Sequence, residues 1–184
     1  MEYFIMRQDP RVYNAAEPTG ADISGLRHMT REEINAVSMP INLYIKNTKA
    51  AEFPDYIEKP LMLVSEKLKK IMSKYQKDVI FKTVILIEKG TNRQEIYYLI
   101  SAPQIDCASG ETTYDKRGNI NDLVIDEKKI GGARIFFTGK NEKLILVRLD
   151  AAESILRRDS NGVLFEKCKA VNAEGVMFRG HTRE

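Results

Sequence analysis

The sequence predicts an α+β fold in which a mainly antiparallel sheet carries helices on one face. Strand-like apolar runs at residues 61–64, 79–88 and 94–101 accompany a single strongly amphipathic helix. The same strand–helix–strand plan recurs over residues 144–165, after a β-rich middle section with strong turn sequences. Two such units around a β-rich middle are typical of helices segregated to one side of an antiparallel sheet.

Composition places the chain among ordinary folded domains. Its 184 residues are 43% hydrophobic and 30% charged, which excludes intrinsic disorder, a collagen-like repeat and a disulfide-rich scaffold. A chain of this length can bury about 70% of its extended surface, so it needs neither a disulfide nor a metal to hold its core. There is no signal-peptide pattern and no apolar run of about eighteen residues, so we expect a soluble, cytoplasmic protein.

Residues 1–60 are interpreted as a loop-rich segment, because most of the six prolines lie there. One short helix is expected after Thr30, since Thr30 and Glu33 have the spacing of a capping box. A strand is expected at residues 41–45, with Leu43 and a flanking isoleucine on one face. We expect this segment to pack on the core of an α+β domain formed by residues 61–180.

The first strand–helix–strand unit begins with a buried strand at residues 61–64. Ser65 then has the position of an N-cap for a helix over about residues 66–76. The apolar side chains of this helix share an arc of about 100° that would face a core: Leu68, Ile71, Met72 and Tyr75. A hairpin of strands at 79–88 and 94–101 follows, and the second strand has almost no polar face, which indicates a central place in the sheet.

The β-rich middle leads into a second unit. A turn is predicted at residues 115–119, a single helical turn at 126–129 and a strand at 134–138. A strand at 144–147, a helix at about 149–158 and a strand at 163–165 then repeat the first unit. The aligned residues lie 83 or 84 positions apart: Leu61/Leu144, Leu63/Leu146, Val64/Val147 and Phe81/Phe165. An old duplication and the same local solution reached twice both explain this spacing.

The sequence contains no recognisable catalytic, cofactor-binding or metal-binding constellation. Its two histidines, His28 and His181, have no metal spacing and no neighbouring nucleophile, so they are expected on the surface. Its two cysteines, Cys107 and Cys168, form no C-x-x-C pair and are expected as reduced core thiols, with a single disulfide left open.

Carboxylates gather in the middle section: Asp106, Glu111, Asp115, Asp122, Asp126 and Glu127. A calcium loop needs oxygen ligands at alternate positions, with a glycine at the sixth. Lys116 and Arg117 stand where ligands would be needed, so a turn is favoured over a cation site.

A lysine stripe is the most distinctive surface feature. Its members project within about 80° of one another on the first helix: Lys67, Lys70, Lys74 and Lys77. Residues 65–93 carry eight bases against three acids, whereas the whole chain has a net charge of only +3. Such a stripe suits an acidic protein partner or a phosphate backbone, and a solvated helix face is the plain alternative. Exposed aromatics are not interleaved with it, which disfavours nucleic acid.

The order and spacing of several segments resembles the immunity proteins of bacterial polymorphic-toxin systems, a family formerly described as a domain of unknown function and often named for a Myxococcus representative. The segments that carry the resemblance are residues 61–68, 97–101, 105–107, 114, 123–131, 135–137 and 144–147. Arg148 stands where the second unit of that family often has a serine, and the resemblance does not reach the first sixty residues. It implies a protein that binds and neutralises a cognate protein toxin without performing chemistry.

Three interpretations follow, in order of preference. The first is a non-catalytic immunity protein with no cofactor, whose lysine stripe contacts the toxin. The second is a small cytoplasmic hydrolase that uses Cys107 or the middle carboxylates such as Asp106. The third is a weak nucleic-acid-binding module that uses the lysine stripe. The sequence leaves open whether the protein is a homo-oligomer, and an exposed sheet edge would be the expected pairing site.

Overall fold

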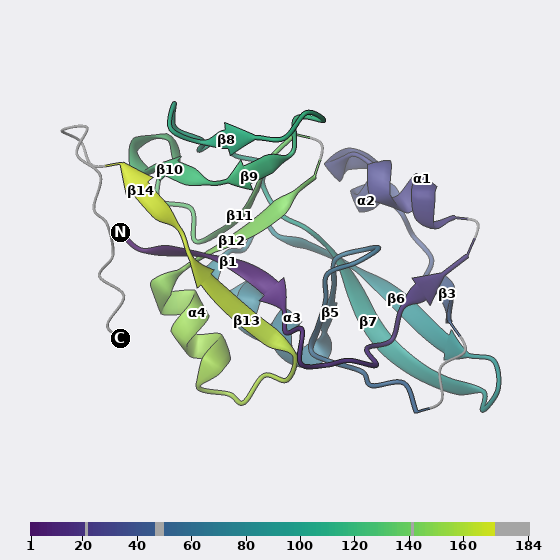
Figure 1. The fold of residues 1–184 in the computed structure, drawn as a ribbon. Coiled ribbons are helices and arrows are strands. Elements are labelled where there is room, and N and C mark those ends of the chain that lie inside the picture. Colours follow the sequence, from purple (N-terminus) through teal and green to yellow (C-terminus); the bar gives the residue numbers. More distant parts are fainter. Residues whose placement is uncertain (21, 47–49, 141, 172–184) are drawn as a thin grey trace.

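The computed structural model describes residues 1–20, 22–46, 50–140 and 142–171, and Figure 1 shows how they form two main sheets. The strands of the six-stranded sheet are β2 (Pro18–Thr19), β3 (Ile41–Ile45), β4 (Tyr56–Ile57), β5 (Leu63–Ser65), β6 (Ile80–Glu88) and β7 (Arg93–Ser101). Their order in the sheet is β2-β3-β6-β7-β5-β4. The strands of the four-stranded sheet are β1 (Tyr3–Gln8), β11 (Ile135–Thr138), β12 (Leu144–Arg148) and β13 (Val163–Lys167), in the order β11-β12-β1-β13.

Helices and two small strand pairs complete the fold. The helices are α1 (Ile23–His28), α2 (Arg31–Ala36), α3 (Glu66–Tyr75) and α4 (Leu149–Leu156), with a 3-10 turn η1 at Glu127–Lys129. The small pairs join β8 (Thr113–Tyr114) to β9 (Ile120–Asp122) and β10 (Val124–Asp126) to β14 (Lys169–Val171). The α+β class is confirmed, but the strands form two main sheets where the sequence suggested one, because each strand–helix–strand unit contributes to a sheet of its own.

The predicted helix starts are confirmed by their caps. Thr30 and Glu33 form a capping box at the start of α2, and the Ser65 hydroxyl accepts a hydrogen bond from Leu68 N at the start of α3. Helix α1 was not predicted, because its N-cap residue Asp22 makes no side-chain cap and its first turn has no acidic residue. The N-terminal segment therefore has two short helices where one was expected.

The two units share one topology. In the first, β5, α3 and β6 follow one another, and β7 lies between β5 and β6, antiparallel to both. In the second, β12, α4 and β13 follow one another, and β1 lies between β12 and β13, antiparallel to both. The central strand of the second unit thus comes from the opposite end of the chain. Residues 1–60 were expected to pack on the core of a domain formed by residues 61–180, and they supply strands to both sheets.

The registers of the two units also correspond. The paired residues are Val64–Tyr98 and Phe81–Ile100 in the first sheet, and Val147–Phe4 and Phe165–Met6 in the second. The residues that the sequence aligned therefore occupy the same places in both sheets. An outer strand, β4 in one sheet and β11 in the other, extends the match.

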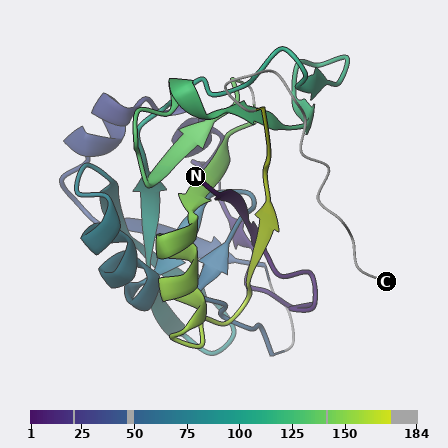
Figure 2. The same ribbon diagram turned by 90° about the vertical axis from the view of Figure 1, so that its left-hand side faces the viewer.

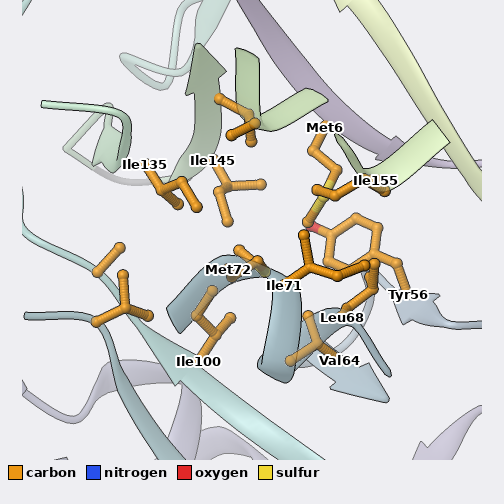
Figure 3. Close-up of a cluster of buried hydrophobic side chains, with 14 of the residues drawn as sticks. Met6, Tyr56, Val64, Leu68, Ile71, Met72, Ile100, Ile135, Ile145 and Ile155 are labelled. Atoms are coloured by element: carbon orange, nitrogen blue, oxygen red, sulfur yellow. The ribbon is translucent and has the colours of Figure 1, made fainter. Parts of the chain in front are cut away.

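A shared core joins the inner faces of both sheets to α3 and α4, which lie side by side (Figure 2). Figure 3 shows this cluster, to which Leu68 and Met72 of α3, Ile155 of α4 and Met6 of β1 contribute. The predicted apolar arc of α3 is confirmed, since Leu68, Ile71 and Met72 are buried and Tyr75 packs against the cluster. The outer faces of the sheets belong to two other clusters, one with α1 and α2 and one with the β-rich middle.

The six-stranded sheet ends in two-residue strands on both sides, β2 and β4. These outer strands are short, and β2 pairs with only Tyr44 and Ile45 of β3. The homo-oligomer that the sequence left open stays a prediction. Among the described residues, no helix is long and apolar enough to cross a membrane.

Candidate functional site

Three members of the predicted lysine stripe, Lys67, Lys70 and Lys74, lie on α3. The prediction that Lys77 shares this helix is wrong, because α3 ends at Tyr75 and Lys77 lies in the turn that follows.

The first member, Lys67, is part of the fold. Lys67 Nζ lies 3.0 Å from Asp55 Oδ2 and donates a hydrogen bond of 3.1 Å to the backbone oxygen of Asp159. Asp55 also accepts hydrogen bonds from Ser65 Oγ at 2.5 Å and from the backbone N–H of Asn161 at 2.7 Å. Lys67 therefore connects the start of α3 to the loop that follows α4.

The other three stripe lysines are more available. Lys70 Nζ lies 3.4 Å from a carboxylate oxygen of Glu66, one turn earlier on α3. Lys74 and Lys77 are exposed, and neither forms an ion pair with another residue that the structure describes. The unpaired charge of the stripe is thus concentrated at the C-terminal end of α3 and just beyond it.

Beside α3, part of one face of the six-stranded sheet is not covered by any helix of the described residues. In Figure 1, β3 and the β6–β7 hairpin extend away from α3. We call the apolar part of this surface the open sheet face: Tyr44, Ile85, Ile87 and Ile96. The side chain of Tyr44 is 45% exposed and that of Ile96 is 57% exposed, while Ile85 and Ile87 are half-buried.

Strand alternation explains why these residues point to the same side. Val84, Leu86 and Tyr97 point to the opposite face and belong to the cluster beneath α1 and α2. Their neighbours must therefore point toward the α3 side. In the register Tyr44 lies beside Ile87 and Ile85 beside Ile96, so the four residues form one continuous surface.

Two lysines border the open sheet face. Lys89 Nζ lies 4.2 Å from the centre of the Tyr44 ring, and Lys69 Nζ lies 3.7 Å from the centre of the Tyr98 ring. The other strand positions on this face between them are uncharged: Asn42, Thr83 and Gln94. An apolar surface is therefore bordered by positive charge at both ends.

Two adjoining cavities lie where the sheets meet, with volumes of about 220 and about 720 Å³. Ser101, Phe137, Lys140 and Lys143 line both of them. The smaller one is bordered by the ion pair of Lys59 and Glu142 at 2.9 Å, and the pKa of Glu142 is lowered mainly by its hydrogen bond with Lys59. Sequence reasoning missed these cavities because their lining comes from segments far apart in the chain.

The cysteines have the environment of core residues. Cys107 is fully buried, its Sγ lies 3.5 Å from Thr138 Oγ1, and burial raises its pKa. Cys168 is also buried, and burial raises its pKa to about 12. Both thiols are free, as expected. Because the thiolate is the nucleophilic form, these environments oppose the chemistry that a hydrolase would need.

Asp106 and the histidines do not complete a nucleophilic site around Cys107. Asp106 is exposed and lines the larger cavity, whereas Cys107 points into the core. His28 is exposed, as expected, and borders the smaller cavity. His181 lies outside the described residues.

The middle carboxylates are dispersed over local structural roles. Asp115 Oδ1 accepts hydrogen bonds of 2.8 Å from the backbone N–H groups of Arg117 and Asn119, as the predicted turn requires. These backbone hydrogen bonds, with that of the Asn119 side chain, lower the pKa of Asp115. Asp126 caps η1, and Glu127 pairs with the amino group of Met1. Nowhere in the described parts of the chain do three or more His, Cys, Asp or Glu residues gather as metal ligands would.

The geometry thus presents exposed lysines and an open apolar face, while the thiols are buried and the carboxylates are dispersed. Residues 7–170 match the model of an immunity protein family, Imm11. The chain belongs to the Imm11 immunity protein family. This confirms the resemblance and extends it, since the Imm11 match begins in β1 and includes residues 7–60. No curated protein matches the chain.

Proposed function

We propose that this Imm11 protein binds a cognate toxin of a polymorphic-toxin system and neutralises it in the cytoplasm of the producing cell, without performing chemistry. The match to an immunity protein family across both sheets carries this proposal. The buried thiols and dispersed carboxylates support binding over catalysis. Binding would inhibit by covering the toxin's active site or by holding the toxin in an inactive state.

Titration of the toxin with the immunity protein separates binding from catalysis. The probe is the toxic C-terminal domain of the cognate toxin, and its residual activity is measured as purified Imm11 protein is added. A binding inhibitor removes activity linearly, with an endpoint at a fixed molar ratio. An enzyme that modifies the toxin would remove activity at far lower ratios, with a loss that grows with time. Failure of the co-expressed protein to rescue growth would contradict the proposed function altogether.

The lysine stripe is proposed to steer association toward an acidic toxin surface. Charge reversal at Lys74 and Lys77 tests this more cleanly than reversal at Lys67, which would also break the contact with Asp55. Steering by a few charges changes association rates by about 10-fold or more at low salt. We therefore expect K74E/K77E to slow association about 10-fold and to weaken its salt dependence.

The matched control reverses two exposed lysines of the β-rich middle, Lys116 and Lys128. K116E/K128E makes the same change in net charge, so it should alter the association rate by less than about 2-fold if steering is local. Equal effects of the two double variants would show that only net charge matters. An unchanged rate in K74E/K77E would remove the stripe from the proposal.

A further inference from the structure

We infer that the open sheet face, formed by Tyr44, Ile85, Ile87 and Ile96, is the surface on which the toxin docks, and that the toxin presents there an apolar patch bordered by carboxylates. This inference rests on the proposed function. It goes beyond that function by naming the surface and the chemistry of its partner.

The backbone of the face is ordered by strand pairing without a partner. Its residues lie on β3, β6 and β7, and β6 pairs with both β3 and β7 along this stretch. A backbone that is already paired need not be ordered on binding, which favours affinity. The half-buried Ile85 and Ile87 form a floor between the more exposed Tyr44 and Ile96.

The apolar residues of the face are also not part of the hydrophobic core. None of its four members belongs to, or packs against, the three buried clusters of the described residues. By contrast, Tyr98 and Phe81 on the same side of the sheet pack against the cluster with α3 and α4. A contiguous exposed apolar patch on a folded domain marks an interaction site, whereas scattered single residues do not.

The bordering charges select the kind of partner. Lys69 and Lys89 stand at opposite ends of the patch. Glu66 pairs with Lys69 at 3.5 Å and with Lys70 at 3.4 Å, so two lysines and one carboxylate leave a net positive charge at the Lys69 end. In a two-fold contact between copies of this chain, the same surface meets itself, so these lysines would approach one another. Like charges facing each other oppose association, whereas carboxylates on a toxin would complement both ends. The observed charge therefore favours an acidic partner over a second copy.

Substitution of Ile96 by Glu tests the inference. Ile96 is the most exposed member, so the fold should tolerate the change, while a buried carboxylate in the contact would be unpaired. Disruption of a central contact residue commonly costs a large share of the binding energy. We expect I96E to raise the dissociation constant for the toxic domain of the cognate toxin by about 100-fold or more.

Leu164 of β13 supplies the matched control, since it is a strand residue of the other sheet and is 37% exposed. L164E should bind the toxin within about 2-fold of the parent protein. Thermal unfolding of both variants shows that neither has lost the fold. Binding by the parent together with unchanged affinity of I96E and Y44E would overturn this inference and leave the proposed function standing. Absence of binding by the parent would overturn both.

Hydrogen exchange of the unmodified protein provides a second measurement that needs no variant. Addition of the toxin should slow amide exchange in residues 42–44 and 94–96 at the edges of the face, while β13 is unchanged. Protection confined to other elements would overturn the inference. Sedimentation of the free protein decides the remaining alternative: a dimer that I96E converts to a monomer would assign the face to self-association.

Discussion

The two strand–helix–strand units are built on the same frame with different side chains. In the first unit, Ser65 N donates to Asp55 O at 2.8 Å, and in the second Arg148 N donates to Arg134 O at the same distance. A buried tyrosine on each central strand donates to the backbone next to these acceptors: Tyr97 to Pro54 O at 2.6 Å, and Tyr3 to Ala133 O at 3.0 Å. Agreement in topology, register and these hydrogen bonds favours an old duplication over a local solution reached twice.

The ion pairs at the starts of α3 and α4 show that the charges can differ between the two units while the backbone arrangement is the same. Asp55 pairs with Lys67 in the first unit, and Arg134 pairs with Asp150 at the corresponding place in the second. The position of the pair is kept while its polarity is reversed. Backbone pairing and apolar volume therefore define the unit, and the charges can be exchanged as long as each still finds an opposite partner.

The clearest functional difference is at the outer edge. The first sheet continues beyond β6 into β3 and β2, whereas the second ends at β13. The open sheet face lies on β3 and on the far ends of β6 and β7, which extend beyond the parts that match β13 and β1. The shared frame thus provides stability, and β3 with the extended β6–β7 hairpin provides the proposed docking surface.

The largest expected difference between the units is in the loss of stability when the charged residues at corresponding positions, Asp55 and Arg134, are replaced by alanine. The Asp55 carboxylate is nearly buried and accepts from Ser65, Lys67 and Asn161. D55A removes the acceptor of the Ser65 and Asn161 donors and the ion-pair partner of Lys67, so it should lower the free energy of unfolding by about 2–4 kcal/mol. Arg134 is half-exposed and 3.7 Å from Asp150, so R134A should cost less than about 1 kcal/mol.

Urea denaturation of both variants measures this difference. D55N is the control, because it keeps the size and an acceptor oxygen while it removes the charge, and it should retain more stability than D55A. Equal losses in D55A and R134A would contradict the view that Asp55 joins the two units through Asn161.

Local patterns in the sequence predicted most elements, but not the strands whose place depends on distant partners. The capping box at Thr30, the N-cap Ser65 and the 89–93 turn are read within a few residues, and all are confirmed. β1 and β4 were not predicted, because the buried residues of β1, Tyr3 and Met6, do not alternate along the strand and β4 has only two residues. Their partners lie on strands remote in sequence, so pairing rather than local preference fixes them.

The surface features were predicted in the same uneven way. Helical spacing placed Lys67, Lys70, Lys74 and Lys77 on one helix, but it could not show that Asp55 holds the first of them. The open sheet face was missed, because the alternation in β6 and β7 reads as core until the extent of α3 is known. Which part of an apolar strand is exposed depends on the elements that pack over it, and this tertiary packing cannot be predicted from the strand's own sequence.

The corresponding tyrosines, Tyr97 and Tyr3, allow a test in which the same substitution should have similar effects on stability in the two units. Y97F and Y3F each remove a phenol that donates to a backbone oxygen, so each should lower the free energy of unfolding by about 0.5–1.5 kcal/mol. Y97F should cost slightly more, because its hydrogen bond is shorter and fully buried. The double variant should be additive when measured by urea denaturation. A loss confined to one variant would show that the two hydrogen bonds are not equivalent.

A substitution of Arg148 by serine gives the second unit the N-cap residue that Ser65 is in the first unit. The Arg148 side chain hydrogen-bonds to Asp150 and lowers its pKa. Because this pKa is lower in the folded state, Asp150 adds stability above its unfolded value of about 3.9, and that stability is lost as the pH falls through the folded value. R148S should therefore raise the pKa of Asp150 and reduce the loss of stability in acid.

At neutral pH the effect of R148S on stability should be within about 1 kcal/mol, since a new hydroxyl cap offsets the lost pair. An NMR titration of the Asp150 carboxyl measures the shift. Asp115 serves as the internal control, because its lowered pKa comes from hydrogen bonds within its own turn. An unchanged pKa of Asp150 in R148S would show that Arg148 does not lower it.

The smallest effect is expected at Tyr56, where its sign matters more than its size. Tyr56 is fully buried, and its hydroxyl has no hydrogen-bond partner among the described residues. Its phenol oxygen points toward Met6 (Figure 3), and burial raises its pKa. The corresponding residue of the second unit is Ile135, which buries no polar group there. Y56F should therefore leave stability unchanged or raise it by about 1 kcal/mol, since an unpaired buried hydroxyl is costly. The same chemical change in Y97F should be destabilising, and urea denaturation of both variants measures the two effects. Equal losses of stability in Y56F and Y97F would show that the Tyr56 hydroxyl is hydrogen-bonded and would contradict the proposed difference between the units.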